Sequence, residues 1–268
     1  MTKQTRRRTI ILFGGGGYIG HYVAHEIVRR NHLPINYDWQ RRCEVEGAPL
    51  NFKDTLPIMC DGFIHLACPR NKPGRWNRKL AQLAWEDGCK VASKCPGPKI
   101  YVSSMSVFDE PRTDYGEFKL MTEQKARQEG FKIVRLGTVY GVAPGMPYRE
   151  DLALHTIMRS WLYEPRNAFV HDRARRHVVY IHTVARQLAI LVLADDPTRI
   201  ADVTELTEGI VSYKDIVPIS VRQQRVGDPG PRPSVGRSMC TADKIQAQEC
   251  LMDFAYVLTR KEKPAWPI

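Results

Sequence analysis

The sequence predicts an α/β fold built on a parallel sheet. Short β-rich runs alternate with helical stretches through the first half of the 268-residue chain, and a glycine-rich turn joins the first run to the first helix. Strands that alternate with helices pair in parallel, because each helix carries the chain back across a face of the sheet. Hydrophobic residues at 43% and charged residues at 26% are ordinary for a globular protein.

Hydrophobic periodicity and turn residues give the expected elements in order. Strands are expected at Thr9–Phe13, Ile35–Tyr37, Gly62–Leu66, Lys99–Ser103, Lys132–Leu136 and His177–Ile181. Helices are expected at Tyr18–Arg30, Trp76–Ala92, Tyr115–Gln128, Asp151–Tyr163, Thr183–Leu193 and Thr241–Leu251. Glycines and prolines between Gly141 and Pro147 interrupt the rhythm, and Arg222–Arg237 has the composition of a loop.

The glycine-rich turn GGGGYIG is typical of a dinucleotide-binding site. It places Gly14, Gly17 and Gly20 three residues apart, with Tyr18 and Ile19 between the last two, at the point where a strand passes into a helix. Glycines let the backbone turn tightly and let a pyrophosphate approach the helix N-terminus, where free N–H groups and the helix dipole favour anions. A plain glycine-rich turn is the alternative, and the order of strand, turn and helix favours binding.

Asp38 follows the second expected strand, eighteen residues after Gly20. A carboxylate about 20 residues beyond the glycines accepts hydrogen bonds from the adenosine ribose and favours NAD. Arg41 and Arg42 leave NADP open, because an arginine can receive a 2′-phosphate.

Charge and cysteine content exclude several other classes. The net charge is +11, but the Lys and Arg residues form no long basic block, so nucleic acid is not the expected partner. An acidic small-molecule substrate, such as one carrying a diphosphate, explains the excess of positive charge at least as well as nucleic acid does. The seven cysteines include no CxxC pair and no histidine pair has metal-ligand spacing, so we expect no metal, and reduced thiols in a cytoplasmic protein. No run of residues is long and apolar enough to span a membrane.

Tyr115 and Lys119 lie four residues apart in YGEFK, on one face of an expected helix. A fixed ammonium beside the phenol, together with a positive nicotinamide, stabilises the phenolate that acid–base chemistry needs. Such a pair also arises on ordinary solvated helix faces, so the spacing alone does not identify a site.

Seven segments in order resemble the extended branch of the short-chain dehydrogenases/reductases, which includes UDP-galactose 4-epimerases and dTDP-4-dehydrorhamnose reductases. Besides the glycine motif and YGEFK, they are DGFIHLA at 61–67, Asn77 opening a helix, VSSMSVF at 102–108, VRLGTVYG at 134–141 and RHVVYIHTVA at 176–185. The resemblance covers residues 9 to about 193. It implies a Rossmann-type doubly wound parallel sheet with a smaller C-terminal lobe, and a homodimer.

The resemblance also implies roles for individual residues. Ser104, with Ser103 and Ser106 as neighbours of the same type, matches the serine that binds the reacting oxygen. Tyr115 matches the acid/base and Lys119 the lysine that binds the nicotinamide ribose. Further positions that match cofactor contacts are Leu66, Ala67, Gly137 and Thr138. Arg176 matches an arginine that grips the substrate diphosphate, and we take Arg232, among Arg225, Arg232 and Arg237, as the second.

The resemblance weakens at the substrate side. Only ten residues separate Ser104 from Tyr115, and His177 and Thr183 stand where the family commonly has aspartates. We therefore assign 1–143, with 177–193 returning to it, to the dinucleotide-binding domain, and 144–176 with 194–268 to a substrate lobe.

The sequence thus predicts an NAD(P)-dependent nucleotide-sugar epimerase or reductase that transfers a hydride at a sugar carbon. A 4,6-dehydratase is disfavoured, because Met105 and Ser106 stand where those relatives carry an acidic pair. The hypothesis from another class is a catalytically idle member that senses through its dinucleotide site or binds RNA. The complete Ser104, Tyr115 and Lys119 set argues against it.

Overall fold

The computed structural model describes residues 6–38, 50–52, 60–68, 70–72, 75–141, 152, 154–155 and 175–212. Arg41, Arg42, Arg232, most of the helix expected at Asp151–Tyr163, the loop at Arg222–Arg237 and the helix at Thr241–Leu251 lie outside the described residues. The chain divides into two compact units. The first comprises 1–103, 120–135 and 182–204, and the second comprises 104–119, 136–181 and 205–268.

A seven-stranded sheet forms the centre of the first unit, with the ends of three strands running into the second. Its spatial order is β11 (Val203–Leu206), β8 (Lys132–Leu136), β7 (Lys99–Ser104), β4 (Gly62–His65), β1 (Thr9–Phe13), β2 (Leu33–Tyr37) and β3 (Leu50–Phe52). The pairs from β7 to β3 are all parallel. β1 lies between β2 and β4, so the chain leaves β1 toward one side of the sheet and later returns on the other. This reversal confirms the predicted doubly wound Rossmann-type sheet.

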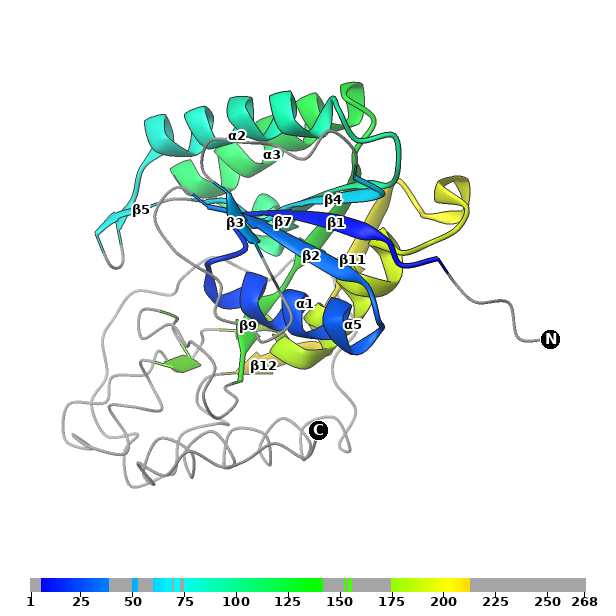
Figure 1. Cartoon of the computed structure of the whole chain (residues 1–268). Coiled ribbons are helices and arrows are strands. Elements are labelled where there is room, and N and C mark those ends of the chain that lie inside the picture. The colour runs from blue at the N-terminus through cyan, green and yellow to red at the C-terminus, as the bar shows by residue number, and fades with distance from the viewer. Residues whose placement is uncertain are drawn as a thin grey trace. The chain divides into compact units, whose positions relative to one another are not determined.

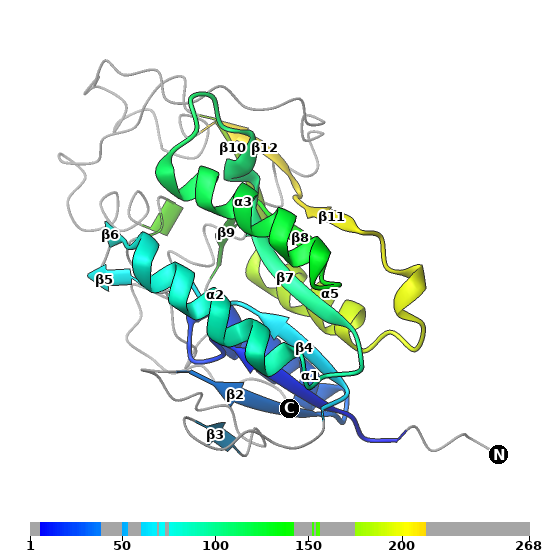
Figure 2. The same ribbon diagram turned by 90° about the horizontal axis from the view of Figure 1, so that it is seen from above.

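Helices cover both faces of this sheet (Figure 1). α2 (Arg78–Ala92) and the first-unit part of α3 (Asp114–Gln128) lie on one face, and α1 (Tyr18–Arg29) and α5 (Ile181–Val192) lie on the other. Figure 2 shows α2 and α3 side by side, and the guanidinium of Arg78 reaches the Met121 sulfur at 3.3 Å. α2 begins because the Asn77 side chain accepts a hydrogen bond from the Leu80 N–H at 3.0 Å.

Apolar strands buried on both faces build the core of the first unit, as parallel sheets require. Ile10, Leu12, Phe63, Ile64 and Ile100 are fully buried. An aromatic group fills the space beneath α2, where the Trp85 ring lies 5.3 Å from the Tyr101 ring and 5.4 Å from the Phe131 ring. A small hairpin of β5 (Arg70–Lys72) and β6 (Arg75–Trp76) and the short turn η3 (Pro197–Arg199) complete this unit.

The second unit has a three-stranded sheet of its own. β10 (Arg175–Tyr180) is central, parallel to β9 (Thr138–Tyr140) and antiparallel to β12 (Gly209–Ser212). Glu208 connects β9 and β10. Its carboxylate accepts hydrogen bonds from the Tyr180 N–H at 3.0 Å and from the Tyr140 hydroxyl at 3.3 Å. The single-turn helix η1 (Met105–Phe108) and the first turns of α3 also belong to this unit.

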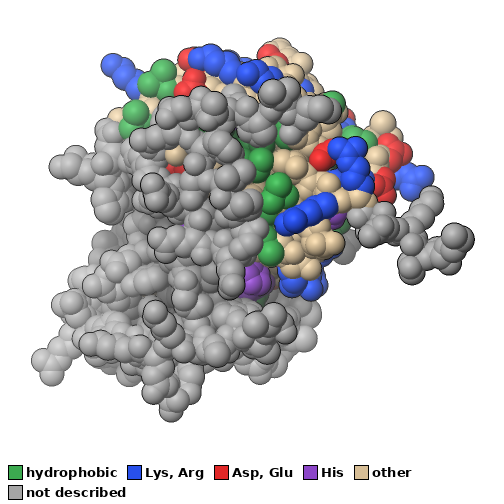
Figure 3. Space-filling model, viewed as in Figure 1, with side chains coloured by type: hydrophobic (Ala, Val, Ile, Leu, Met, Phe, Trp, Pro, Cys, Tyr) green, Lys and Arg blue, Asp and Glu red, His purple; other side chains and the backbone are tan. Residues whose placement is uncertain are grey.

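No helix among the described residues is long and apolar enough to cross a membrane. On the face drawn in Figure 3, the Lys and Arg side chains of the described part are interspersed with Asp and Glu side chains.

Candidate functional site

The predicted glycine turn lies directly between β1 and α1. Gly14 has a φ of +89°, which glycine adopts without strain, and a β-carbon there would lie 2.7 Å from the backbone N and Cα of Ala67. A β-carbon on Gly20 would likewise collide with the backbone of Gly15, so the start of α1 packs closely on the turn. These glycines are needed because backbone approaches backbone closely where β1 passes into α1.

Three parallel strands bring the first group of predicted residues to one edge of the sheet. The register aligns Phe13 of β1 with Tyr37 of β2 and with His65 of β4. The next residues along each strand, Gly14, Asp38 and Leu66, therefore leave the sheet side by side. Their backbones are tied together, because the Gly14 N–H donates to the Tyr37 carbonyl at 2.7 Å and the Leu66 N–H donates to the Phe13 carbonyl at 2.8 Å.

The N-terminus of α1 has the features that the predicted anion site requires. Gly17 is the N-cap, the first turn holds no acidic side chain, and no side chain in the described part of the chain caps it. The first N–H groups of a helix lack internal partners, and the helix dipole places partial positive charge there. Tyr18 is buried with its ring 5.6 Å from the Tyr22 ring, so its ring serves packing. Ile19 is half-buried in the same turn.

In the second unit, Ser104 ends β7 and begins η1. Its Oγ accepts a hydrogen bond from the Ser106 N–H at 3.2 Å and another from the Ser106 hydroxyl at 2.9 Å. The Ser104 side chain is half-buried. Because both contacts use lone pairs of the Ser104 oxygen, its own proton stays available for a further acceptor. Ser103 points the other way along the strand and is buried.

Tyr115 and Lys119 lie on one face of α3, as their spacing predicts. The Lys119 side chain is buried, with 4% of its surface exposed, and its Nζ lies 5.8 Å from the centre of the Tyr115 ring. The Tyr115 side chain is half-buried. A solvated helix face would expose both groups, so the burial of this lysine favours the functional interpretation of the YGEFK motif.

Sequence reasoning missed the role of Gly116. A β-carbon on Gly116 would lie 2.5 Å from the carbonyl oxygen of Ser106, and the Gly116 N–H donates to the Thr113 hydroxyl oxygen at 3.2 Å. The first turn of α3 therefore rests directly on the turn that Ser104 begins. The signal was present, since a glycine inside a helical pattern often marks a close packing contact.

Gly137 links β8 to β9, and Thr138 is the first residue of β9. A β-carbon on Gly137 would come within 2.9 Å of the His177 carbonyl carbon and oxygen, so glycine permits β10 to approach this point. Thr138 pairs with Val178 in the parallel β9/β10 ladder and is half-buried.

Arg176 lies on β10 near Asp109, the residue that ends η1. Burial raises the pKa of the Asp109 carboxyl, and the positive charges of Arg176 and His177 oppose that rise. His177 is itself buried, with its Nδ1 3.5 Å from the Thr207 hydroxyl. Sequence reasoning did not single out Asp109 as a neighbour of Arg176, because the two lie far apart along the chain.

The predicted residues thus fall into two groups. Gly14, Gly17, Gly20, Asp38, Leu66 and Ala67 meet in the first unit. The second unit contains the other group: Ser104, Tyr115, Lys119, Gly137, Thr138 and Arg176. Among the described residues, no group of three or more His, Cys, Asp or Glu side chains is placed to hold a metal ion.

Solved structures with the same fold include several that bind dinucleotides. The chain aligns over 96% of its length with 99% of TunA, an NAD-dependent NDP-hexosamine 5,6-dehydratase involved in tunicamycin biosynthesis, at 18% identity and a TM-score of 0.70. It aligns over 95% with all of MoeE5, solved with UDP-glucuronic acid and NAD, at 18% identity and a TM-score of 0.71. The UDP-glucose 4-epimerase of Thermus thermophilus, solved with NAD, aligns over 95% of this chain and 100% of its own at 14% identity and a TM-score of 0.61.

No family model matches the chain, and no curated protein matches it. At identities of 18% and below, the structural similarity establishes the fold. It confirms the predicted resemblance at that level, since the chain has the fold of NAD-dependent epimerases and dehydratases.

Proposed function

We propose that this chain is an NAD-dependent enzyme of the extended short-chain dehydrogenase/reductase type that acts on a nucleotide sugar. The observation that carries the proposal is the Ser104, Tyr115 and Lys119 group. A buried ammonium lies 5.8 Å from the centre of a half-buried tyrosine ring, on a helix turn that rests against the turn of Ser104. A binding protein has no need to bury a lysine beside a phenol at that cost in desolvation.

The first unit fits a dinucleotide. Gly14 and Gly20 let the turn pack closely between β1 and α1, and the N-terminus of α1 would offer its N–H groups to a pyrophosphate. Asp38 would accept hydrogen bonds from the ribose hydroxyls and would repel a 2′-phosphate, which favours NAD over NADP. When bound, the nicotinamide would supply the hydride chemistry.

The residues of the second unit would then have separate roles. Tyr115 would take the proton from a sugar hydroxyl, or give it to a carbonyl oxygen. Ser104 donates its free hydroxyl proton to the same sugar oxygen, and the Lys119 ammonium stabilises the phenolate and binds the nicotinamide ribose. Arg176 would bind the diphosphate, because its planar guanidinium offers two parallel N–H donors. MoeE5 was solved with UDP-glucuronic acid and the Thermus thermophilus enzyme is named a UDP-glucose 4-epimerase, which makes a UDP-sugar the first substrate to test.

The experiment is a thermal-shift panel followed by turnover. NAD, NADP, UDP-glucose, UDP-N-acetylglucosamine and UDP-glucuronic acid are added singly, because a ligand that binds only the folded protein raises its Tm. Ligands that shift the Tm then enter an assay that follows nicotinamide absorbance and the sugar product by NMR. An epimerase returns NAD unchanged and inverts a carbon, whereas a reductase consumes NADH. NAD binding without turnover of any nucleotide sugar would instead support the idle, sensing alternative.

A further inference from the structure

Two cysteines of the first unit meet in the core on the α2 side of the sheet. Cys60 stands two residues before β4, and Cys95 stands three residues after α2 ends. Both carry free thiols, and their side chains are 4% and 3% exposed. Both belong to the aromatic and aliphatic cluster that includes Trp85 and Tyr101.

The backbone brings these two residues close together. β4 and β7 are parallel neighbours in which Phe63 pairs with Lys99, and the Phe63 N–H donates to the Pro98 carbonyl at 2.9 Å. Following this pairing backward sets Cys60 beside the residue after Cys95, and the close packing of Gly97 on the Asp61 carbonyl continues the approach. Neighbouring strands lie about 4.8 Å apart. A disulfide joins Cα atoms roughly 4.4–6.8 Å apart.

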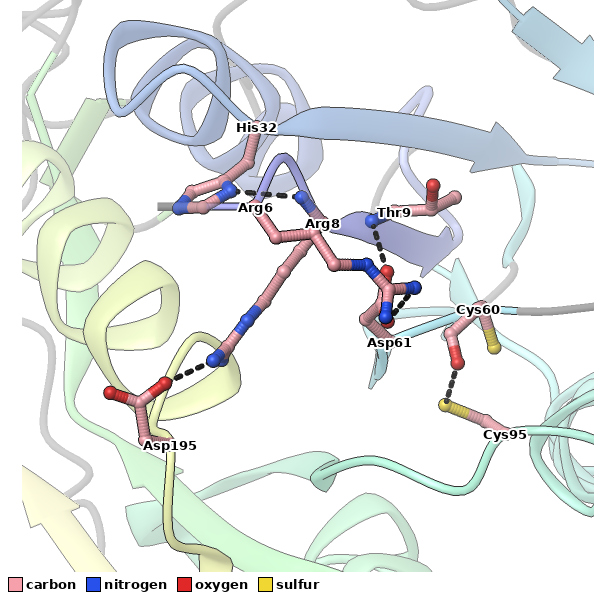
Figure 4. Close-up of polar contacts among 8 residues, drawn as sticks. All are labelled: Arg6, Arg8, Thr9, His32, Cys60, Asp61, Cys95 and Asp195. Atoms are coloured by element: carbon pink, nitrogen blue, oxygen red, sulfur yellow. Dashed lines mark hydrogen bonds and ion pairs between the residues drawn. The ribbon is translucent and has the colours of Figure 1, made fainter. Parts of the chain in front are cut away.

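The Cys95 side chain is directed at the Cys60 backbone. The Cys95 thiol donates to the carbonyl oxygen of Cys60 at 3.6 Å, and Figure 4 shows its sulfur directed at Cys60. Contact with the Cys60 thiol lowers the pKa of Cys95, while contact with Cys95 and burial raise the pKa of Cys60. We take Cys95 as the attacking sulfur and Cys60 as its partner, because the Cys95 thiol is the one directed at the other residue.

We propose that Cys60 and Cys95 form an oxidative modification site, at which a small peroxide converts the two thiols to a disulfide. The Cys95 thiolate attacks one peroxide oxygen, the O–O bond breaks, and the released hydroxide takes a proton to become water. The Cys60 sulfur then attacks the Cys95 sulfenic acid, and the hydroxyl leaves with the Cys60 proton as a second water. Two thiols are oxidised and one peroxide is reduced to two waters. This inference does not depend on the proposed function.

Cys89 supplies the matched control. It packs against the same cluster, and burial raises its pKa to about 11, so it stays a thiol at neutral pH. A cross-link between Cys60 and Cys95 joins residues 35 apart in the sequence. By constraining the unfolded chain, it should raise the Tm by roughly 5–10 °C. Dinucleotide affinity should change little, because Cys60 lies at the opposite end of β4 from Ala67.

The test treats the full-length protein with hydrogen peroxide and measures intact mass, a non-reducing peptide map and Tm. Wild type and Cys89→Ser should each lose two hydrogen atoms, give a peptide pair that joins Cys60 to Cys95, and melt higher until a reductant is added. Cys60→Ser and Cys95→Ser should show no such pair and no rise in Tm. If either variant fails to fold, alkylation of the oxidised wild type still reports the two thiols, which should be protected together. Unreacted thiols, sulfinic acid without a cross-link, or a disulfide from either residue to another cysteine would overturn the proposal.

Discussion

Gly116 in the first turn of α3 lies against the carbonyl oxygen of Ser106, so closely that a β-carbon at Gly116 would stand 2.5 Å from that oxygen. This contact joins the helix turn that carries Tyr115 to the turn that begins at Ser104. The position of the tyrosine relative to the serine thus depends on a residue that takes no part in chemistry.

The first prediction concerns Gly116→Ala. Alanine favours a helix by about 1 kcal/mol over glycine. Overpacking a close contact costs about 1–3 kcal/mol. We expect the contact to dominate, so the variant should unfold at lower denaturant concentration and lose turnover together. Glu117→Ala, at the exposed next position of the same helix, is the control and should keep both. A Gly116→Ala protein that is more stable than wild type would show that the contact is loose.

A second prediction separates close approach from backbone strain at Gly14. Gly14→Ala meets a positive φ and the backbone of Ala67 at 2.7 Å, whereas Gly130→Ala meets a positive φ with no atom within 4 Å. Both variants should lose about 1–2 kcal/mol of stability from strain. Only Gly14→Ala should weaken NAD binding, by at least about tenfold, or ~1.4 kcal/mol. Calorimetry measures the NAD affinity of both variants. Equal affinities would show that the glycine turn is not part of the cofactor site.

Much of the first unit could be predicted from the sequence because its signals are local. The strands at Thr9–Phe13 and Lys132–Leu136 have the predicted bounds, and the helix from Tyr18 ends one residue early at Arg29. The second strand begins earlier than expected, at Leu33, because Pro34 lies in a parallel ladder that its missing N–H does not prevent. The expected helix at Trp76 begins at Arg78, after the Asn77 cap.

Tertiary contacts decided what the sequence could not predict. β9 and β12 are short and lack an alternating pattern, so only pairing with β10 makes them strands. The contact of Gly116 with Ser106 and the charges that act on Asp109 likewise join residues without a common local pattern. The division into a dinucleotide-binding domain and a substrate lobe stays a prediction, as do the roles of Arg176 and Arg232.

The third prediction is a loss of stability in mild acid through His32. The Arg8 backbone N–H donates to His32 Nδ1 at 3.1 Å, and Figure 4 shows this contact beside the ion pair of Arg8 with Asp195. Burial, aided by the positive charge of Arg8, lowers the pKa of His32 from its ordinary value of 6.5. Below pH 6.5 the unfolded chain therefore binds the proton that the folded state resists, and stability falls as pH falls through that value toward the lowered pKa.

His32→Gln keeps a hydrogen-bond acceptor but cannot titrate. The free energy of unfolding, measured with denaturant, should therefore fall less steeply between pH 7 and pH 5 in this variant than in wild type. Burial also lowers the pKa of His182, so His182 should still contribute to the loss of stability in acid when His32 is replaced. An unchanged pH profile in the variant would place His32 outside this linkage.

A fourth prediction concerns Arg176. Removal of a guanidinium that binds phosphate costs about 1.5–3 kcal/mol. Arg176→Ala should therefore raise the KM for a UDP-sugar by about 10- to 100-fold. NAD affinity should stay within twofold of wild type, and Arg176→Lys should recover only part of the loss, because an ammonium cannot form two parallel hydrogen bonds. Arg199→Ala, at the exposed turn η3, is the control. Unaltered KM in Arg176→Ala would point to a simple carbonyl compound as the substrate.

The most direct measurement of the central claim is the turnover of Tyr115→Phe with NAD and the nucleotide sugar that the panel selects. The substitution keeps the ring beside the Lys119 ammonium and removes only the hydroxyl. Since general acid–base groups contribute about 10²–10⁴-fold, kcat should fall by that factor while calorimetric NAD affinity and Tm stay close to wild type. A Tyr115→Phe protein that keeps more than half of the wild-type kcat would contradict the account.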